Sequence, residues 1–299
     1  MEENTRENKM GTMPIGKLLA NMAGPVMISM LFQALYNIVD SVFVARLSQD
    51  AMNAVSLAFP LQTLCIAFAV GTGVGMNALL ARSLGEKNMQ AVDRAAGTGL
   101  FLTLCTAAVF AVLGFSLATP FFRFQTENAQ IIVYGSDYVM ICIGGSLGLF
   151  LQIYGERLLQ STGRTDLSMI SQIAGAVCNI VLDPIFIFAL HLGVRGAAIA
   201  TVLSQLLSAA WVVKFLTGKK AELKLDFRGF RPDWHYIQRI TVLGIASFVM
   251  SFTDTLVQVA CNATLRNFGG DLYISVMTVL NSVRQIAQTP VLAIADGAS

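Results

Sequence analysis

The stretch SMLFQALYNIVDSVFVARL (residues 29–47) has the composition of a membrane-spanning helix, yet it carries the carboxylate of Asp40 between apolar neighbours. A charged side chain at membrane depth costs at least about 2.5–3.5 kcal/mol on insertion scales. Asp40 therefore needs a partner, a proton or a water-filled cavity. Polar residues recur on this helix every three or four positions and so share one face turned away from lipid: Ser29, Gln33, Tyr36, Asn37 and Asp40.

The rest of the chain also has the composition of a membrane protein. Of its 299 residues, 55% are hydrophobic and only 13% are charged. Its apolar runs recur, and each is long enough to cross a bilayer, which takes roughly 20 residues per helix. The sequence predicts an all-α polytopic membrane protein with spans at 18–46, 53–81, 95–119, 131–154, 168–190, 195–217, 237–266 and 272–297. The small formal charge of +2 is spread over short loops, which indicates contact with membrane lipids and no nucleic-acid partner.

The basic residues predict how the chain is oriented. Sorting Lys and Arg by alternate sides of the spans places most of them on one side: Arg6, Lys9, Lys17, Arg82, Lys87, Arg94, Arg157, Arg164 and the run from Lys214 to Arg239. The other side receives only Arg46, Arg123, Arg195 and Arg266. Because basic loops stay in the cytoplasm, we expect a multi-pass protein of the inner (plasma) membrane with a cytoplasmic N-terminus.

The spans group into two units. We expect a cytoplasmic tail at 1–14, an N-lobe of six transmembrane helices at 15–218, a cytoplasmic linker at 219–236 and the first two helices of a second lobe at 237–299. The start of the seventh span faintly repeats the first: Gly24 matches Gly244, Met30 matches Met250, Phe32 matches Phe252, Val39 matches Val259 and Arg46 matches Arg266. An even number of helices separates the copies, so both have one orientation. The last apolar run has no polar stop, and we expect a truncated second lobe whose remaining helices are partners of this part.

Two further spans carry polar faces. The fifth has Ser168, Gln172, Gly175, Asn179 and Asp183 at helical spacing, and the sixth has Thr201, Ser204, Gln205 and Ser208. Pro184 cannot donate a hydrogen bond to the carbonyl of Ile180, which predicts a free acceptor and a bend beside Asp183.

Depth predicts which of these residues meet. Asp40 precedes Arg46 by six residues, Thr201 follows Arg195 by six and Asp183 precedes His191 by eight. At about 1.5 Å per residue, all three lie roughly 9–12 Å below the outer surface. Asp40, Asn179, Asp183 and Thr201 would then form an oxygen-rich layer for Na⁺, or a carboxyl pair that holds one proton. No other metal and no organic cofactor is expected. For the serine, threonine and glutamine residues, hydrogen bonding between helices is the competing explanation.

Three other features have more than one interpretation. Pro25 would allow the first helix to kink and to swing Asp40, although proline is also common near helix starts. Asp254 and Arg284 lie at equal depth in the last two spans, which predicts either a structural buried ion pair or a role in a transport path. GTGVG at 71–75 indicates close helix packing or a hinge.

Several of these features together resemble the multidrug and toxic compound extrusion (MATE) family of antiporters. They are the first helix GPVMISMLFQALYNIVDSVFVARL, the NIVLDP of the fifth span, a threonine early in the sixth and the internal repeat. The resemblance covers nearly the whole chain but only part of the twelve-helix family body, which implies two six-helix lobes around a cavity that opens alternately to each side. It implies a cation site on Asp40, Asn179, Asp183 and Thr201 and a bend at Pro25. The candidates for the cavity are Gln33, Tyr36, Asn37, Gln172, Gln205, Asp254 and Arg284.

The function that this resemblance implies is transport. We expect export of lipophilic, often cationic compounds in exchange for Na⁺ or H⁺. A lipid-linked oligosaccharide flippase of the same superfamily is the alternative, but it generally needs cavity cations to hold phosphates, and Arg284 is the only strongly internal cation expected. An intramembrane enzyme is less favoured, because His191 and His235 lie at span edges without metal-ligand spacing. A structural membrane protein is a further option if both aspartates are dispensable.

Overall fold

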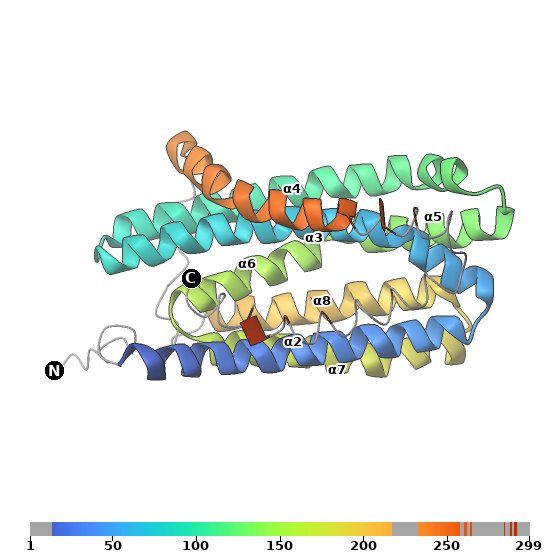
Figure 1. Cartoon of the computed structure of the whole chain (residues 1–299), viewed down its shortest axis with the longest axis horizontal. Helices are drawn as coiled ribbons and strands as arrows, with labels where there is room; N and C mark the ends of the chain where they lie inside the picture. Colours follow the sequence, from blue (N-terminus) through green and yellow to red (C-terminus); the bar gives the residue numbers. More distant parts are fainter. Residues whose placement is uncertain are drawn as a thin grey trace.

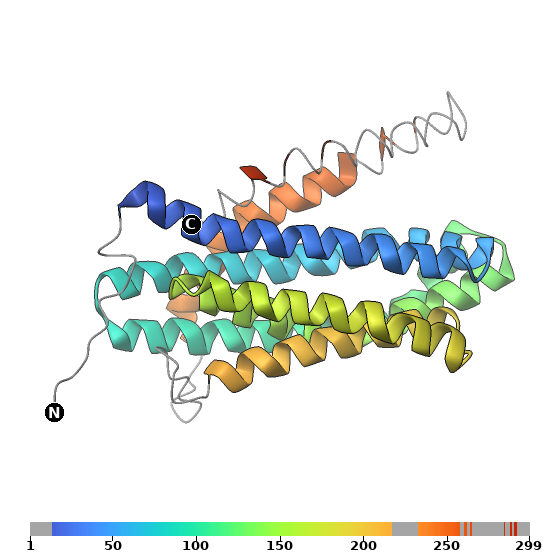
Figure 2. The same cartoon turned by 90° about the horizontal axis from the view of Figure 1, so that it is seen from below.

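The apolar segments form long helices that lie side by side along one axis (Figures 1 and 2). The structure is a computed structural model that describes residues 14–216 and 233–257, together with residues 260, 261, 264, 284, 288, 290 and 291. The helices are α2 (Ile15–Ala45), α3 (Gln49–Gly85), α4 (Met89–Gln125), α5 (Ala129–Gly144), α6 (Leu147–Ser161), α7 (Thr165–Pro184), the π-helical turn η1 (Ile185–Ala189) and α8 (Val194–Leu216). A further helix spans Trp234–Val257.

Short polar turns determine where several helices begin. The Ser48 hydroxyl accepts a hydrogen bond from the backbone N–H of Ala51 at 3.0 Å. The side-chain amide oxygen of Asn88 accepts one from the backbone N–H of Ala91 at 3.1 Å. Asn128 does the same for Gln130 at 2.9 Å. Because the first N–H groups of a helix have no partner within the helix, these side chains stabilise the starts of α3, α4 and α5.

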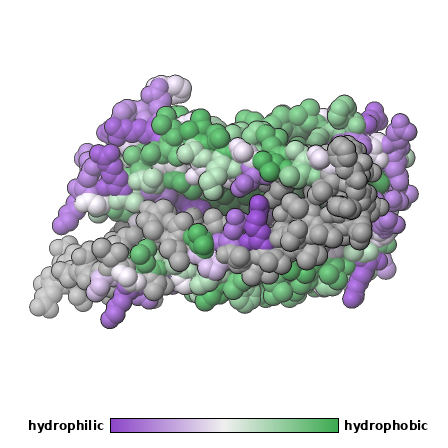
Figure 3. Space-filling view, in the orientation of Figure 1, coloured by the Kyte–Doolittle hydropathy of each residue, from purple (hydrophilic) through white to green (hydrophobic). Residues whose placement is uncertain are grey.

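Most of the predicted spans are present as helices long and apolar enough to cross a membrane. They are α2, α3, α4, α7 with η1, α8 and the Trp234–Val257 helix. On the visible face, hydrophilic residues gather at both ends of the molecule and a hydrophobic band lies between them (Figure 3). Most of the predicted eighth span lies outside the described residues, as do the tail at 1–14 except Pro14, most of the linker at 219–236 and most of the end of the seventh span. The predicted domain limits stay predictions.

The fourth span differs from its prediction. In place of one helix at 131–154, the structure has α5 and α6, which are bent by 42° relative to each other and continue to Ser161. The chain breaks at Gly144 and Gly145, where the N–H of Ser146 turns to the carbonyl of Ile143 in place of the regular i−4 acceptor. As a consequence, Arg157 belongs to α6 and not to a cytoplasmic loop, which corrects the sorting of basic residues.

The prolines of α2 and α7 have different effects. α2 continues as one α-helix through Pro25. After Pro184, by contrast, the helix widens into the π turn η1, so the predicted irregularity beside Asp183 takes this form. α2 packs chiefly along α7, which places the polar faces of the first and fifth predicted spans side by side (Figures 1 and 2).

The glycines of the GTGVG segment are packing positions in an unbroken helix. A Cβ on Gly75 would collide with the carbonyl oxygen of Ile240, and a Cβ on Gly244 would collide with that of Gly71. The Trp234–Val257 helix therefore touches α3 backbone to backbone. The rings of Phe68 and Phe248 extend this contact, with centroids 4.5 Å apart. Close helix packing, one of the two predicted roles of this segment, is confirmed.

Candidate functional site

Four residues from three helices meet in what we call the aspartate site: Asp40 of α2, Asn179 and Asp183 of α7, and Thr201 of α8. The side-chain N–H₂ of Asn179 donates to Asp183 Oδ1 and to Thr201 Oγ1, each at 3.4 Å. The carboxyl groups of Asp40 and Asp183 face each other within hydrogen-bonding reach. The structure thus brings together the four residues predicted to share one layer.

The aspartate site is rich in oxygen acceptors and poor in donors. Asn179 and Asp183 are 1% and 0% exposed. Within the described part of the chain, Asp40 Oδ1, Asn179 Oδ1 and Asp183 Oδ2 are buried and find no donor. A hydrogen bond between two carboxyl groups requires a proton on one of them, because two ionised carboxylates only accept. A proton or a small oxygen-seeking cation would satisfy these atoms, and the residues present fit either.

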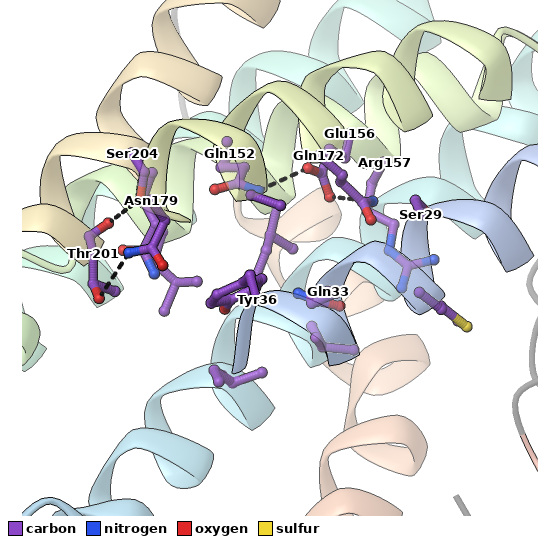
Figure 4. A pocket seen from close by; sticks show the side chains of 18 of the residues that line it. Ser29, Gln33, Tyr36, Gln152, Glu156, Arg157, Gln172, Asn179, Thr201 and Ser204 are labelled. Atoms are coloured by element: carbon purple, nitrogen blue, oxygen red, sulfur yellow. Dashed lines mark hydrogen bonds between the residues drawn. The ribbon is translucent and has the colours of Figure 1, made fainter. Parts of the chain in front are cut away.

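A cavity of about 280 Å³ extends from the aspartate site between α2, α3, α6, α7 and α8. Figure 4 shows its side chains pointing toward one another from several helices. Its polar wall consists of Ser29, Gln33, Tyr36, Gln152, Glu156, Arg157, Gln160, Gln172, Asn179, Thr201, Ser204 and Gln205. The remaining wall is mostly aliphatic. Cavities between the helices of a bundle are common small-molecule sites, and this one has more polar groups in its wall than such sites usually have.

The wall itself contains one buried carboxyl group, in what we call the glutamate site: Glu156 and Gln152 of α6 with Gln172 of α7. Glu156 is 7% exposed. Its Oε1 accepts a hydrogen bond from Gln152 Nε2 and its Oε2 accepts one from Gln172 Nε2, both at 2.9 Å. Nearby, Arg157 Nη1 donates to Gln160 Oε1 at 3.0 Å. Here the carboxylate has a donor on each oxygen.

Glu156 is absent from the predicted site, because the apolar run of the fourth span ends before this residue and the polar residues that follow are typical of a loop. Gln152, Glu156 and Gln160 are spaced four residues apart, which places them on one helix face. This spacing, together with the predicted polar face of the fifth span, is the signal that could have identified the site. Gln172, a predicted cavity residue, belongs to it.

The other predicted residues divide into two groups. Gln33, Tyr36 and Gln205 line the cavity as expected, whereas Asn37 is exposed and does not contribute to its wall. At about 100° per residue, Asn37 is rotated by roughly 100° from Tyr36, which places it at the edge of the polar face. Pro25 precedes the cavity residue Val26, and its hinge role stays a prediction.

The predicted buried ion pair between Asp254 and Arg284 is wrong. Both residues are exposed, and among the described residues no salt bridge joins them. The close contacts of the Trp234–Val257 helix with α3 are at Ile240 and Gly244, and Asp254 lies ten residues beyond Gly244 along the helix. The turn that was expected to bring the two charges to one depth lies outside the described residues.

Comparison with known proteins gives consistent results. A family model described as MatE matches residues 25–185. The chain is 26% identical over 256 residues to the multidrug export protein MepA of Staphylococcus haemolyticus, which covers 85% of this chain and 57% of that protein. It is 29% identical over 234 residues to an FAD transporter of Shewanella oneidensis, which covers 76% of this chain and 52% of that protein. The chain thus spans little more than half the length of these curated relatives.

Solved structures agree with this result. A MOP superfamily transporter from Pyrococcus furiosus, described as having a binding pocket of reverse polarity, superposes with a TM-score of 0.92 at 26% identity. An outward-facing multidrug resistance transporter of the MATE family gives the same TM-score and identity. Each superposition covers 99% of this chain and 66% of the solved chain.

Proposed function

Because the chain belongs to the MatE family of membrane transporters, we propose that the full-length protein exports lipophilic cationic compounds in exchange for Na⁺ or H⁺. The observation that carries the coupling is the aspartate site, where buried acceptor oxygens of Asp40, Asn179 and Asp183 converge without donors at the edge of the cavity. Uptake of a cation or proton lowers the free energy of such a site.

Exchange requires that the ion favour one of two conformations. Asp40 is on α2, whereas the rest of the site is on α7 and α8. A cation held between these helices would therefore stabilise one arrangement of α2 over another, with Pro25 as the candidate hinge. A ligand shifts a conformational equilibrium only by the difference between its affinities for the two states. Ion binding from outside would thus favour the state that releases the substrate. The membrane is the plasma membrane in this proposal, and the N-terminus of the protein lies in the cytoplasm.

The side chains of the cavity favour a cationic substrate over one with several negative charges. Its wall carries one acidic residue, Glu156, and one basic residue, Arg157, while Asp183 adjoins the wall residue Asn179. The relative described as an FAD transporter raises the alternative of an anionic dinucleotide. An anionic dinucleotide or a lipid-linked phosphate would need several cations, and Arg157 is the one basic side chain among the described wall residues.

Efflux from everted membrane vesicles that contain the full-length protein tests this function. Ethidium transport is measured under an imposed Na⁺ gradient and, separately, under an imposed pH gradient. We expect Asp40→Asn and Asp183→Asn to abolish the ion-dependent part. Asp93→Asn is the matched control, since Asp93 is an exposed carboxylate on α4. Ion-driven efflux at the wild-type rate in both cavity variants would refute the coupling site, and no efflux by the wild type under either gradient would refute the function.

A further inference from the structure

Glu156 is a buried carboxyl group whose two oxygens are both oriented by neighbouring side chains. Its two oxygens are held by amides from two helices, Gln152 on α6 and Gln172 on α7, both at 2.9 Å. Each carboxylate oxygen has two lone pairs, so one amide N–H on each leaves room for a further donor. A buried carboxylate is costly unless donors and cations compensate it, and the adjacent Arg157, which donates to Gln160, is the one basic side chain in the described wall. The cavity beside Glu156 is where such a cation could enter.

The walls around Glu156 indicate the chemistry of that cation. Ile153 lies on the same helix, and Ile66 and Val70 face the cavity from α3. Tyr36 adds an aromatic ring, which can attract a cation by its face. The volume of about 280 Å³ is close to the lower end of ligand pockets, which span roughly 300–1,000 Å³. The ligand that fits is a lipophilic molecule with one ammonium group.

The glutamate site is separate from the aspartate site. Gln172 and Asn179 are seven residues apart on α7, which corresponds to about 10 Å along the helix axis. Figure 4 shows Asn179 and Thr201 on one side of the cavity and Glu156 with Gln172 on the other. The cavity wall therefore includes Asn179 and Thr201, which adjoin two carboxyl groups with buried oxygens that lack donors. About two helical turns away it includes a carboxyl group with a donor on each oxygen.

We propose that Glu156 binds the ammonium group of the transported compound, while Asp40 and Asp183 bind the coupling ion. This inference rests on the proposed function, since it divides the two ligands of an antiporter between two sites. Gln152 and Gln172 are positioning residues, because they orient the carboxylate. The two sites share a cavity but not their side chains, so substitution should impair them independently.

The test uses two probes with one fluorophore and the purified full-length protein. Monodansylcadaverine carries a primary ammonium group, whereas dansyl-butylamide has the same ring system and no charge. We expect Glu156→Gln to weaken monodansylcadaverine binding at least about tenfold, which is the loss of one charge-assisted hydrogen bond. The same variant should bind dansyl-butylamide within about twofold of the wild type, because the isosteric amide preserves the cavity. Fluorescence titration gives both dissociation constants.

Two controls keep the outcomes distinct. Asp93→Asn, which neutralises an exposed carboxylate on α4, should bind monodansylcadaverine as the wild type does. Binding of dansyl-butylamide reports that Glu156→Gln is folded. An equal loss for both probes, unchanged monodansylcadaverine binding in Glu156→Gln, or a wild type that binds neither probe would overturn the proposal. Suppose that Glu156→Gln weakens binding of monodansylcadaverine only, and that the wild type shows no ion-driven efflux. This result would refute the antiporter function and still support an ammonium site at Glu156.

Discussion

The aspartate site and the glutamate site adjoin one cavity, yet their carboxyl groups differ in how many hydrogen-bond donors they receive. Glu156 receives an amide N–H on each oxygen, whereas Asp40 and Asp183 face each other with acceptor oxygens left over. A buried acceptor without a donor costs free energy until something binds it. We therefore expect the number of donors, and not the presence of a carboxyl group alone, to determine which of the two sites exchanges an ion.

The strongest way to break this comparison is to remove both charges of the aspartate site. If Asp40 and Asp183 act as one unit, either asparagine variant should reduce ion-driven ethidium efflux to the background of empty vesicles. The double variant should then be no worse than either single one, since residues that act together are strongly non-additive. Measured efflux rates that fall stepwise, with a further loss in the double variant, would contradict a shared site.

Removal of the amide that connects the aspartate site should have the next largest effect. Asn179 donates to Asp183 and Thr201 and contributes a buried oxygen. Asn179→Ala should raise the ion concentration for half-maximal efflux by about tenfold, since loss of one hydrogen bond to a charged group is worth about 1.5–3 kcal/mol. Asn37→Ala is the matched control on an exposed position of α2. Equal responses of the two variants would argue against Asn179 as an ion ligand.

The glutamate site can be weakened without removal of its charge. Gln152→Ala or Gln172→Ala deletes one of the two amide donors on Glu156 and should lower monodansylcadaverine affinity by about fivefold, the equivalent of roughly 1 kcal/mol. Ion dependence should not change. Gln205→Ala removes an amide from the same cavity on α8, away from the bonds to Glu156, and serves as the control. Should Gln205→Ala lose as much affinity, the positioning role would be wrong.

Substitution of Thr201 is expected to have the smallest effect of these variants. Its hydroxyl oxygen accepts a hydrogen bond from Asn179 at 3.4 Å, a long contact. Thr201→Val keeps the shape and removes this acceptor, so we expect a threefold or smaller rise in the half-maximal ion concentration, about 0.5 kcal/mol. Thr201→Ser should behave as the wild type in the same efflux titration. A serine variant as impaired as the valine variant would indicate packing and not hydrogen bonding.

Much of the architecture could be predicted from the sequence. The all-α membrane fold and the MATE family resemblance are both confirmed, because long apolar runs and the polar pattern around Asp40 and NIVLDP are local signals. The meeting of Asp40 with Asp183 followed from equal depth, since a membrane forces helices to share one axis. Their role in ion coupling stays a prediction.

The remaining features depended on tertiary contacts that a hydropathy pattern does not contain. In the sequence, Glu156 resembles the start of a loop, because one of the amide groups that hydrogen-bond to its carboxyl group, that of Gln172, is on another helix. The bend between α5 and α6 was missed because a glycine pair in an apolar run is also compatible with a straight helix. The predicted Asp254–Arg284 pair assumed that equal depth implies contact, but two helices at the same depth can present their charges to different surroundings.

The backbone contact between α3 and the Trp234–Val257 helix affects how a mutational scan of this transporter should be interpreted. Gly75 and Gly244 are absent from the cavity wall, yet no larger residue fits at either position unless the two helices move apart. Drug-sensitive clones with changes at these glycines would therefore report a displaced helix and not a lost drug contact. Resistance phenotypes alone would not locate the drug-binding residues.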